Sequence, residues 1–276
     1  MLLNIDHKIQ YHYDGNLDLV ALNIRLFPSQ FALQNIVSWR LHVNGCQIKN
    51  IARAPFGNQH ALWISRDEKN TLEIIAKGEI RTRDHAGVLS GFKDYTQSAV
   101  FLRQTKLTRV SEEVLDFVSS PNAKDPLDIM HGLSEKIHQT FEFNDEQKNS
   151  DLTATQILQQ DKGNAQDYAH LFVAAARALN YPARCVIGYL CSSEKDNDKA
   201  QNNKNSLHTW AEAKVPSIGW VGFDSVYNMC PTDRYIRLTC GLDVSDAAIL
   251  RTHITGAQWQ ENTDVIISEL EEEGEV

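Results

Sequence analysis

The chain has 276 residues, of which 42% are hydrophobic and 23% charged, a composition typical of a globular protein with one large domain or two ordinary ones. The formal net charge of -9 and the lack of a lysine- and arginine-rich cluster argue against a protein that binds nucleic acid through its phosphates. Charges interrupt residues 1–8, where a signal peptide needs an apolar core, and no apolar stretch could cross a bilayer. We therefore expect a cytoplasmic protein that does not act at a membrane.

Residues 1–105 show mostly strand-like patterns. Residues 36–43 are followed directly by Asn44-Gly45, a dipeptide that favours a tight hairpin turn. Further apolar runs typical of strands occur at residues 17–26 and 71–77. These patterns predict an N-terminal β-sandwich domain.

Helical spacing replaces the strand patterns after this domain. A short helix is predicted after Ser111, and a longer one begins at Asp125-Pro126, where aspartate acts as the N-cap and proline occupies the first turn. A third helix is predicted over residues 153–160. These helices open an α+β domain that we place at residues 106–265.

The best-marked helix covers residues 165–179. Apolar residues recur along it at spacings of three and four positions, which indicates a buried face, and Asn180 and Pro182 end it. Three strands are predicted after this helix, at residues 183–190, 207–215 and 220–224.

Two segments are expected to stay outside the packed structure. Residues 192–206 are rich in lysine, aspartate and asparagine and show no apolar periodicity, which predicts a mobile surface loop. Residues 266–276 form an acidic tail, whose like charges repel one another.

Cysteine usage argues against disulfides and metal sites. The five cysteines are odd in number and show no Cys-x-x-Cys spacing, so neither a disulfide framework nor a zinc site is indicated. The chain also has no glycine-rich phosphate-binding loop. We therefore expect a protein that needs no metal ion or organic cofactor.

Ala165 stands where the surrounding sequence favours a cysteine nucleophile. It begins a helix, where unpaired backbone N–H groups and the positive end of the helix dipole stabilise a thiolate. The same N–H groups can hold the oxyanion that forms when a thiolate attacks an acyl carbon. A methyl group cannot attack, so the chain as written is expected to be inactive. Cys191, an alternative thiol, has no helix N-terminus beside it.

His208 and Asp224 supply the rest of a catalytic triad. Alternation along the strand places His208 on one face together with Trp210 and Glu212. Asp224 ends the next strand, from which its carboxylate can reach the second ring nitrogen of the histidine and set the tautomer. A nucleophile, a base and an orienting acid in three neighbouring elements meet the requirements of covalent catalysis.

With these residues in place, the chain resembles the bacterial transglutaminase-like proteins of the cysteine-protease type. The resemblance depends on Gly163, Gln166, Asp167, Tyr168, Ala169, His170, Arg177, Ala178, Leu179, Pro182, Ala183, Arg184, Gly188, Tyr189, His208, Trp210, Ala211, Glu212, Gly219, Trp220, Gly222, Phe223 and Asp224. The family's catalytic cysteine, histidine and aspartate fall on Ala165, His208 and Asp224. The resemblance implies a papain-like α+β core after the sandwich, and cleavage or transfer of acyl groups at amide bonds.

The chain departs from the family's pattern at other positions besides Ala165. Ser225 stands where the family has proline, Thr209 where it has alanine, and Leu242 where it has arginine. These departures concern the substrate pocket more than the fold.

Further residues are candidates for contact with a substrate or an oxyanion. Gln159, just before the helix, could donate to an oxyanion, although a solvated helix residue is the simpler interpretation. Asp167 could line the cleft or bond to neighbouring backbone. Glu212 shares the face of the histidine, but it could equally pair with Arg184 or Lys214. The resemblance adds Gln166, Trp210 and Tyr189.

Two explanations for Ala165 stay open. Either a natural cysteine was replaced by engineering, which the retained His208 and Asp224 favour, or the chain is a natural pseudoenzyme that binds a peptide or serves as a scaffold. For the underlying enzyme we predict thiol-dependent hydrolysis of a peptide or of a glutamine or γ-glutamyl amide. Acyl transfer to an amine is the alternative.

Overall fold

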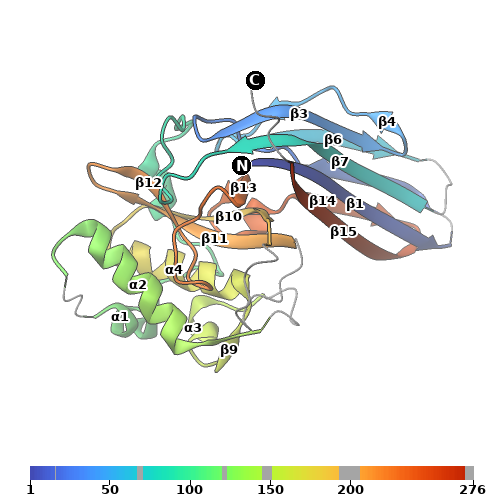
Figure 1. The fold of residues 1–276 in the computed structure, drawn as a ribbon. Coiled ribbons are helices and arrows are strands. Elements are labelled where there is room, and N and C mark those ends of the chain that lie inside the picture. Colours follow the sequence, from blue (N-terminus) through green and yellow to red (C-terminus); the bar gives the residue numbers. More distant parts are fainter. Residues whose placement is uncertain (16, 67–70, 120–122, 145–150, 193–205, 271–276) are drawn as a thin grey trace, which may run out of the picture.

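A β-sandwich lies beside a second sheet and a layer of helices in the computed structural model, which describes residues 1–15, 17–66, 71–119, 123–144, 151–192 and 206–270 (Figure 1). The first sheet of the sandwich contains, in order, β15 (Gln258–Leu270), β1 (Leu2–Asp14), β7 (Thr71–Thr82), β3 (Gln34–Val43) and β4 (Cys46–Gln47). The second contains β14 (Leu250–Thr255), β2 (Leu19–Ile24), β6 (Gln59–Ser65) and β5 (Ala52–Arg53).

The burial pattern of β1 shows why these segments form a sandwich. Leu3, Ile5, His7 and Ile9 are buried while the residues that alternate with them are more exposed, because successive side chains of a strand point to opposite faces. The apolar members of this set join apolar residues of β2 and β7 in one core between the sheets. The predicted hairpin is confirmed, since Asn44 (φ 48°) and Gly45 (φ 77°) have the left-handed conformation that a tight hairpin turn needs.

The C-terminal strands correct the predicted domain boundaries. β14 and β15 pair with β2 and β1, so residues 250–270 belong to the sandwich and not to a core that ends at residue 265. The segment expected to be an acidic tail is part of β15 as far as Leu270, and its remainder lies outside the described residues. Apolar alternation is weak here because β15 is an edge strand with mostly exposed side chains, held by backbone hydrogen bonds to β1.

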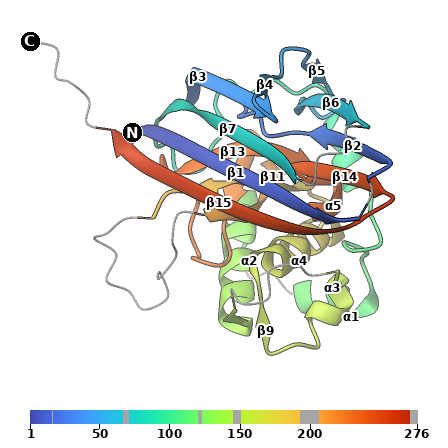
Figure 2. The ribbon, with the colours of Figure 1, turned by 90° about the vertical axis from the view of Figure 1, so that its right-hand side faces the viewer.

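The rest of the chain forms an α+β core, as predicted. Its antiparallel sheet contains, in order, β12 (Gly219–Phe223), β11 (Ser206–Val215), β10 (Ala183–Leu190) and β13 (Tyr235–Gly241). Helix α4 (Ala165–Ala178) packs on this sheet, and α1 (Glu112–Val118) and α3 (Ala154–Ile157) pack against α4 (Figure 2). The smaller elements are η1 (Ser98–Leu102), α1 (Glu112–Val118), α2 (Pro126–Thr140), β8 (Glu142–Phe143), α3 (Ala154–Ile157), β9 (Lys162–Gly163) and α5 (Val244–Ala247).

Side-chain caps confirm the predicted helix starts. Ser111 accepts from a backbone N–H at the start of α1, and Asp125 accepts from two at the start of α2. Thr153 caps α3, which ends at Ile157 and is therefore shorter than predicted. The loop predicted at residues 192–206 lies, from 193 to 205, outside the described residues.

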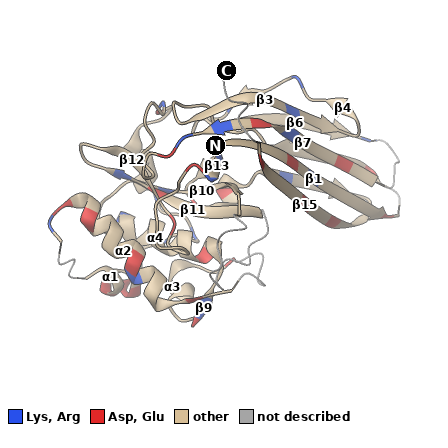
Figure 3. Ribbon diagram, in the orientation of Figure 1, with Lys and Arg blue, Asp and Glu red and all other residues tan. Residues whose placement is uncertain are grey.

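Acidic and basic residues are interspersed over both halves of the ribbon (Figure 3). Within the described ranges, no helix is long and apolar enough to cross a membrane.

His7 lies where the sandwich meets the sheet of the α+β core. Its imidazole is fully buried, and its Nδ1 lies 2.8 Å from the Tyr189 hydroxyl. Burial, opposed by a smaller effect of Asp6, lowers the pKa of His7 to about 4, whereas an unfolded histidine has a pKa of about 6.5. The unfolded chain therefore binds more protons than the folded chain between these values, and the free energy of unfolding falls as the pH decreases through this window.

We expect His7 to lower the free energy of unfolding by about 3 kcal/mol between about pH 6.5 and pH 4, as measured by urea unfolding. His7→Gln should remove this part of the pH dependence, and the exposed His12 offers the control His12→Gln, which should not. Some dependence will remain, because burial also lowers the pKa of His170 to about 4. An unchanged slope in His7→Gln would show that His7 is not responsible.

Candidate active site

Helix α4 begins at a turn fixed by reciprocal hydrogen bonds. The chain enters the helix through β9, which pairs in parallel with β8. The Asp167 backbone N–H donates to the Asn164 side chain, and the Asn164 N–H donates to the Asp167 carboxylate, both at 3.0 Å. This capping box places Ala165 at the first helical position, half-buried and at the positive end of the helix dipole.

His208 and Asp224 form a buried hydrogen-bonded pair. The distance between Nε2 and Oδ2 is 2.6 Å, and the side chains are 5% and 1% exposed. His208 stands on β11, and the hairpin to β12 brings Asp224 beside it. Because a carboxylate accepts hydrogen bonds, it selects the tautomer that carries the proton on Nε2, which leaves Nδ1 as the basic nitrogen.

The turn after β12 holds the Asp224 carboxylate in place. The Asp224 backbone pairs with Met229, and its Oδ1 accepts from the Val226 N–H at 3.0 Å. The Val226 carbonyl in turn accepts from Nδ1 of His138 on α2 at 3.0 Å. These bonds restrict rotation of the carboxylate that orients the histidine.

Tyr235 also contacts the candidate site, although no pattern in the sequence predicts it there. Its hydroxyl donates to Asp224 Oδ2 at 2.8 Å, the oxygen that also accepts from His208. Burial and then the charge of Asp224 raise the pKa of Tyr235, so the hydroxyl stays protonated and remains a donor. No sequence signal marks this contact, because β12 and β13 are opposite edge strands of the sheet.

Aromatic rings surround His208 and connect it to α4. The imidazole centroid lies 5.6 Å from the ring of Tyr227 and 6.4 Å from that of Trp210. Tyr227 lies 6.5 Å from Phe143, and Phe143 lies 6.2 Å from Tyr168 near the start of α4. A continuous series of ring contacts therefore runs from the histidine to the helix that begins at position 165.

Glu212 belongs to a buried ion network on the same strand as the histidine. It accepts from Arg184 Nε at 2.5 Å and from Arg237 Nε at 2.8 Å, and all three side chains are buried. Burial alone would raise the pKa of Glu212, but the two guanidiniums hold it below its usual value. The predicted pairing with Arg184 is confirmed, whereas Lys214 pairs with Asp94.

The remaining candidates from the sequence have different surroundings. Gln159 is exposed just after α3, and Gln166 is half-buried in the first turn of α4. Trp210 is buried against the histidine, as described above. Tyr189 is fully buried and contacts His7, so it has no surface left for a substrate.

Two further side chains are occupied elsewhere. Burial raises the pKa of the Cys191 thiol, which lies in the apolar core shared with the sandwich, and this disfavours the thiolate. His170 accepts a hydrogen bond from the Val244 N–H at 3.1 Å, which ties α4 to α5.

Two stretches of the chain match known families. Residues 117–225 match the Transglutaminase-like superfamily, and residues 3–81 match the Bacterial transglutaminase-like N-terminal region. This part of the chain is therefore similar to a transglutaminase-like domain. Its matched range includes Ala165, His208 and Asp224, and it ends before Tyr235.

The fold of the whole chain is found in a known structure. The crystal structure of a putative cysteine protease from Cytophaga hutchinsonii matches 100% of this chain and 92% of that chain, with a TM-score of 0.75 and 17% sequence identity. At this identity the likeness shows the fold alone, with its sandwich and α+β core.

Two curated relatives match shorter stretches. An uncharacterised protein of Mycobacterium leprae is 31% identical over 99 residues, which are 36% of this chain and 34% of that protein. A second, from Mycobacterium bovis, is 26% identical over 133 residues, which are 46% and 42% of the two chains. The chain thus spans less than half the length of these relatives.

Proposed function

We propose that the transglutaminase-like domain is built for thiol-dependent hydrolysis of amides and that Ala165 occupies the position of its nucleophile. The observation that carries the proposal is the buried pair of His208 and Asp224, with 2.6 Å between Nε2 and Oδ2. A histidine that is held on one nitrogen by a carboxylate can act as a general base through the other. The proposed substrate is a peptide or a glutamine or γ-glutamyl amide, and water is the acceptor.

The chemistry requires a sulfur at position 165. In an Ala165→Cys variant, the thiol passes its proton to Nδ1 of His208, and the thiolate attacks the amide carbon. Backbone N–H groups at the start of α4 stabilise the oxyanion. The imidazolium then protonates the leaving amine as the C–N bond breaks. Water, deprotonated by the same nitrogen, hydrolyses the thioester and restores the thiol.

The chain with alanine can bind a substrate but cannot form the thioester. The retained His208–Asp224 pair and its support by Tyr235 favour an active form that carries cysteine at position 165. The alternative is a pseudoenzyme that presents the same cleft to a peptide. A cysteine codon at this position in the source gene would exclude the pseudoenzyme.

Alkylation of an Ala165→Cys variant tests the arrangement without a substrate. The helix dipole and the imidazole should lower the pKa of the new thiol, so that iodoacetamide labels it at about pH 6 at least about tenfold faster than the exposed Cys46. Peptide mapping by mass spectrometry gives both rates in one sample.

The matched control is the double variant Ala165→Cys with His208→Gln, in which the excess over Cys46 should largely disappear. Equal labelling rates of the two cysteines in Ala165→Cys itself would contradict the proposed geometry. Fast labelling combined with tight peptide binding and no turnover would support the binding protein instead.

A further inference from the structure

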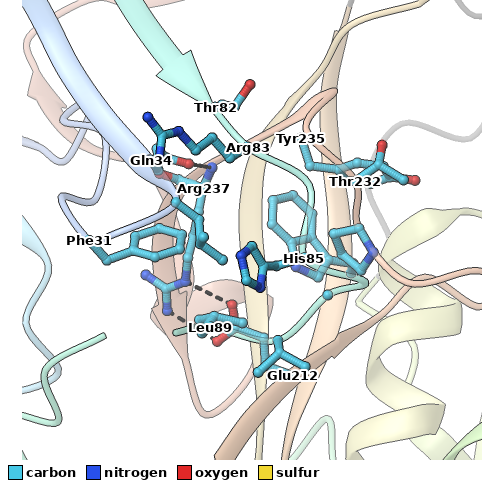
Figure 4. Close-up of a pocket in the computed structure, with 15 residues that line it drawn as sticks. Phe31, Gln34, Thr82, Arg83, His85, Leu89, Glu212, Thr232, Tyr235 and Arg237 are labelled. Carbon is cyan, nitrogen blue, oxygen red and sulfur yellow. Dashed lines mark hydrogen bonds and ion pairs between the residues drawn. The ribbon is translucent and has the colours of Figure 1, made fainter. Parts of the chain in front are cut away.

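A crevice lies on the face of the core sheet that carries Trp210 and Glu212. Residues 83–89, which follow β7, form one wall, and β11 and β13 form the other (Figure 4). Its volume is about 50 Å³, room for about four water molecules, so it can accept a group no larger than a small aliphatic one such as isobutyl. The apolar part of the lining includes Phe31, Leu33, Leu89, Trp210 and Tyr235.

The polar groups at the base of the crevice are already committed. Glu212 pairs with two arginines, and Arg237 also donates to Ser29 Oγ at 2.8 Å. The Gln34 amide donates to the Ser29 and Arg237 carbonyls and accepts from the Arg237 N–H. The base therefore leaves little hydrogen-bonding capacity for a ligand and is suited to an apolar group.

The cationic side chains of the wall, in contrast, are available to a ligand. Arg83 and His85 line the crevice and are exposed. Within the described residues, neither side chain makes a hydrogen bond or an ion pair. The nearby Asp84 accepts from the Ala86 N–H, and Asp233 lies 3.6 Å from the N-terminal ammonium group. A guanidinium fork presents two parallel donors, a geometry that a carboxylate matches.

We propose that this crevice binds a small branched aliphatic carboxylate. The aliphatic group lies among Phe31, Leu89 and Trp210, and the carboxylate is bound by Arg83 with His85 beside it. The same chemistry occurs in a free acylated amino acid and at the C-terminus of a peptide. The crevice shares Trp210 and Tyr235 with the surroundings of His208, but binding of a carboxylate there needs no sulfur at position 165, so the two proposals are tested independently.

Calorimetric titration of the full chain with N-acetylleucine tests the proposal, and N-acetylleucinamide is the matched neutral ligand. The acid should bind about tenfold more tightly than the amide. Arg83→Gln should remove this difference, and Arg103→Gln, at another exposed arginine, should keep it. A peptide that ends in leucine distinguishes the two sources, since it binds equally well only if the crevice accepts a chain end.

Filling the crevice supplies a second test that does not depend on charge. Leu89→Trp should abolish binding of the acid, while urea unfolding verifies that the variant is folded. Equal affinity for acid and amide, no saturable binding of the acid, or retained preference for the acid in Arg83→Gln would overturn the proposal.

Discussion

Ala165→Cys is expected to hydrolyse a susceptible amide at least about a thousandfold faster than the chain with alanine. The reason is that, in the proposed mechanism, His208 held by Asp224 supplies the base and the start of α4 supplies the oxyanion donors, so that only the attacking sulfur is absent. The measurement is release of amine or ammonia from peptides and from glutamine-containing peptides, with and without prior treatment with iodoacetamide. Adding a simple primary amine such as methylamine distinguishes hydrolysis from transfer, because a transferase forms the N-substituted amide whereas a hydrolase releases mainly the free acid.

Variants of the pair then test the mechanism in the Ala165→Cys background. Asp224→Asn should lower kcat by about 10⁴-fold, because an amide that donates to Nε2 stabilises the wrong tautomer. Tyr235→Phe should have a smaller effect, since it removes one donor from Asp224 and leaves His208 in place. If Ala165→Cys shows no iodoacetamide-sensitive activity towards any acyl donor, the proposed function is wrong.

Glu212→Leu is expected to lower the free energy of unfolding by about 3–5 kcal/mol. The substitution leaves the guanidiniums of Arg184 and Arg237 buried without a counter-charge, and desolvation of a charge costs far more than the lost contact. The guanidinium of Arg184 lies 3.8 Å from the Trp220 ring centroid, so it cannot simply turn towards water. Urea unfolding at neutral pH gives the difference directly.

Glu73→Leu is the matched control for this substitution. Glu73 pairs with Lys8 at 2.7 Å, but the two side chains are 35% and 41% exposed, so water and salt screen the pair. The expected loss is at most about 1 kcal/mol. Equal losses in the two variants would show that burial of the network contributes little. If Glu212→Leu does not fold, Glu212→Gln, which keeps an acceptor, should show an intermediate loss.

Local signals were sufficient for much of the fold. The Asn44-Gly45 turn, the starts of α1 and α2, and the strands of the core hairpin depend on residues within a few positions of one another, and the structure has them where the sequence predicted them. His208 and Asp224 come together for the same reason, because a short hairpin joins their strands. The pattern therefore pointed to both residues before their contact was known.

Contacts between distant segments could not be predicted from such local signals. The return of residues 250–270 to the sandwich depends on backbone pairing of β15 with β1. The side chains of this edge strand are mostly exposed, so its sequence shows no apolar alternation from which the pairing could be predicted. Tyr189 was expected near a substrate, but its hydroxyl contacts His7, which belongs to the N-terminal strand and lies 182 residues away in the sequence.

By itself, the sequence determined the elements of the core, the start of the helix at position 165, and the alternation that displays His208. Those features depend on backbone geometry and on neighbours close in the chain, and so they can be derived from spacing. Only the tertiary structure decided that Asp224 is shared between His208 and Tyr235 and that Glu212 neutralises two arginines. It also decided that residues 83–89 cover the same face of the sheet. These contacts depend on the strand order of the core sheet and on how its elements pack, which no local pattern records.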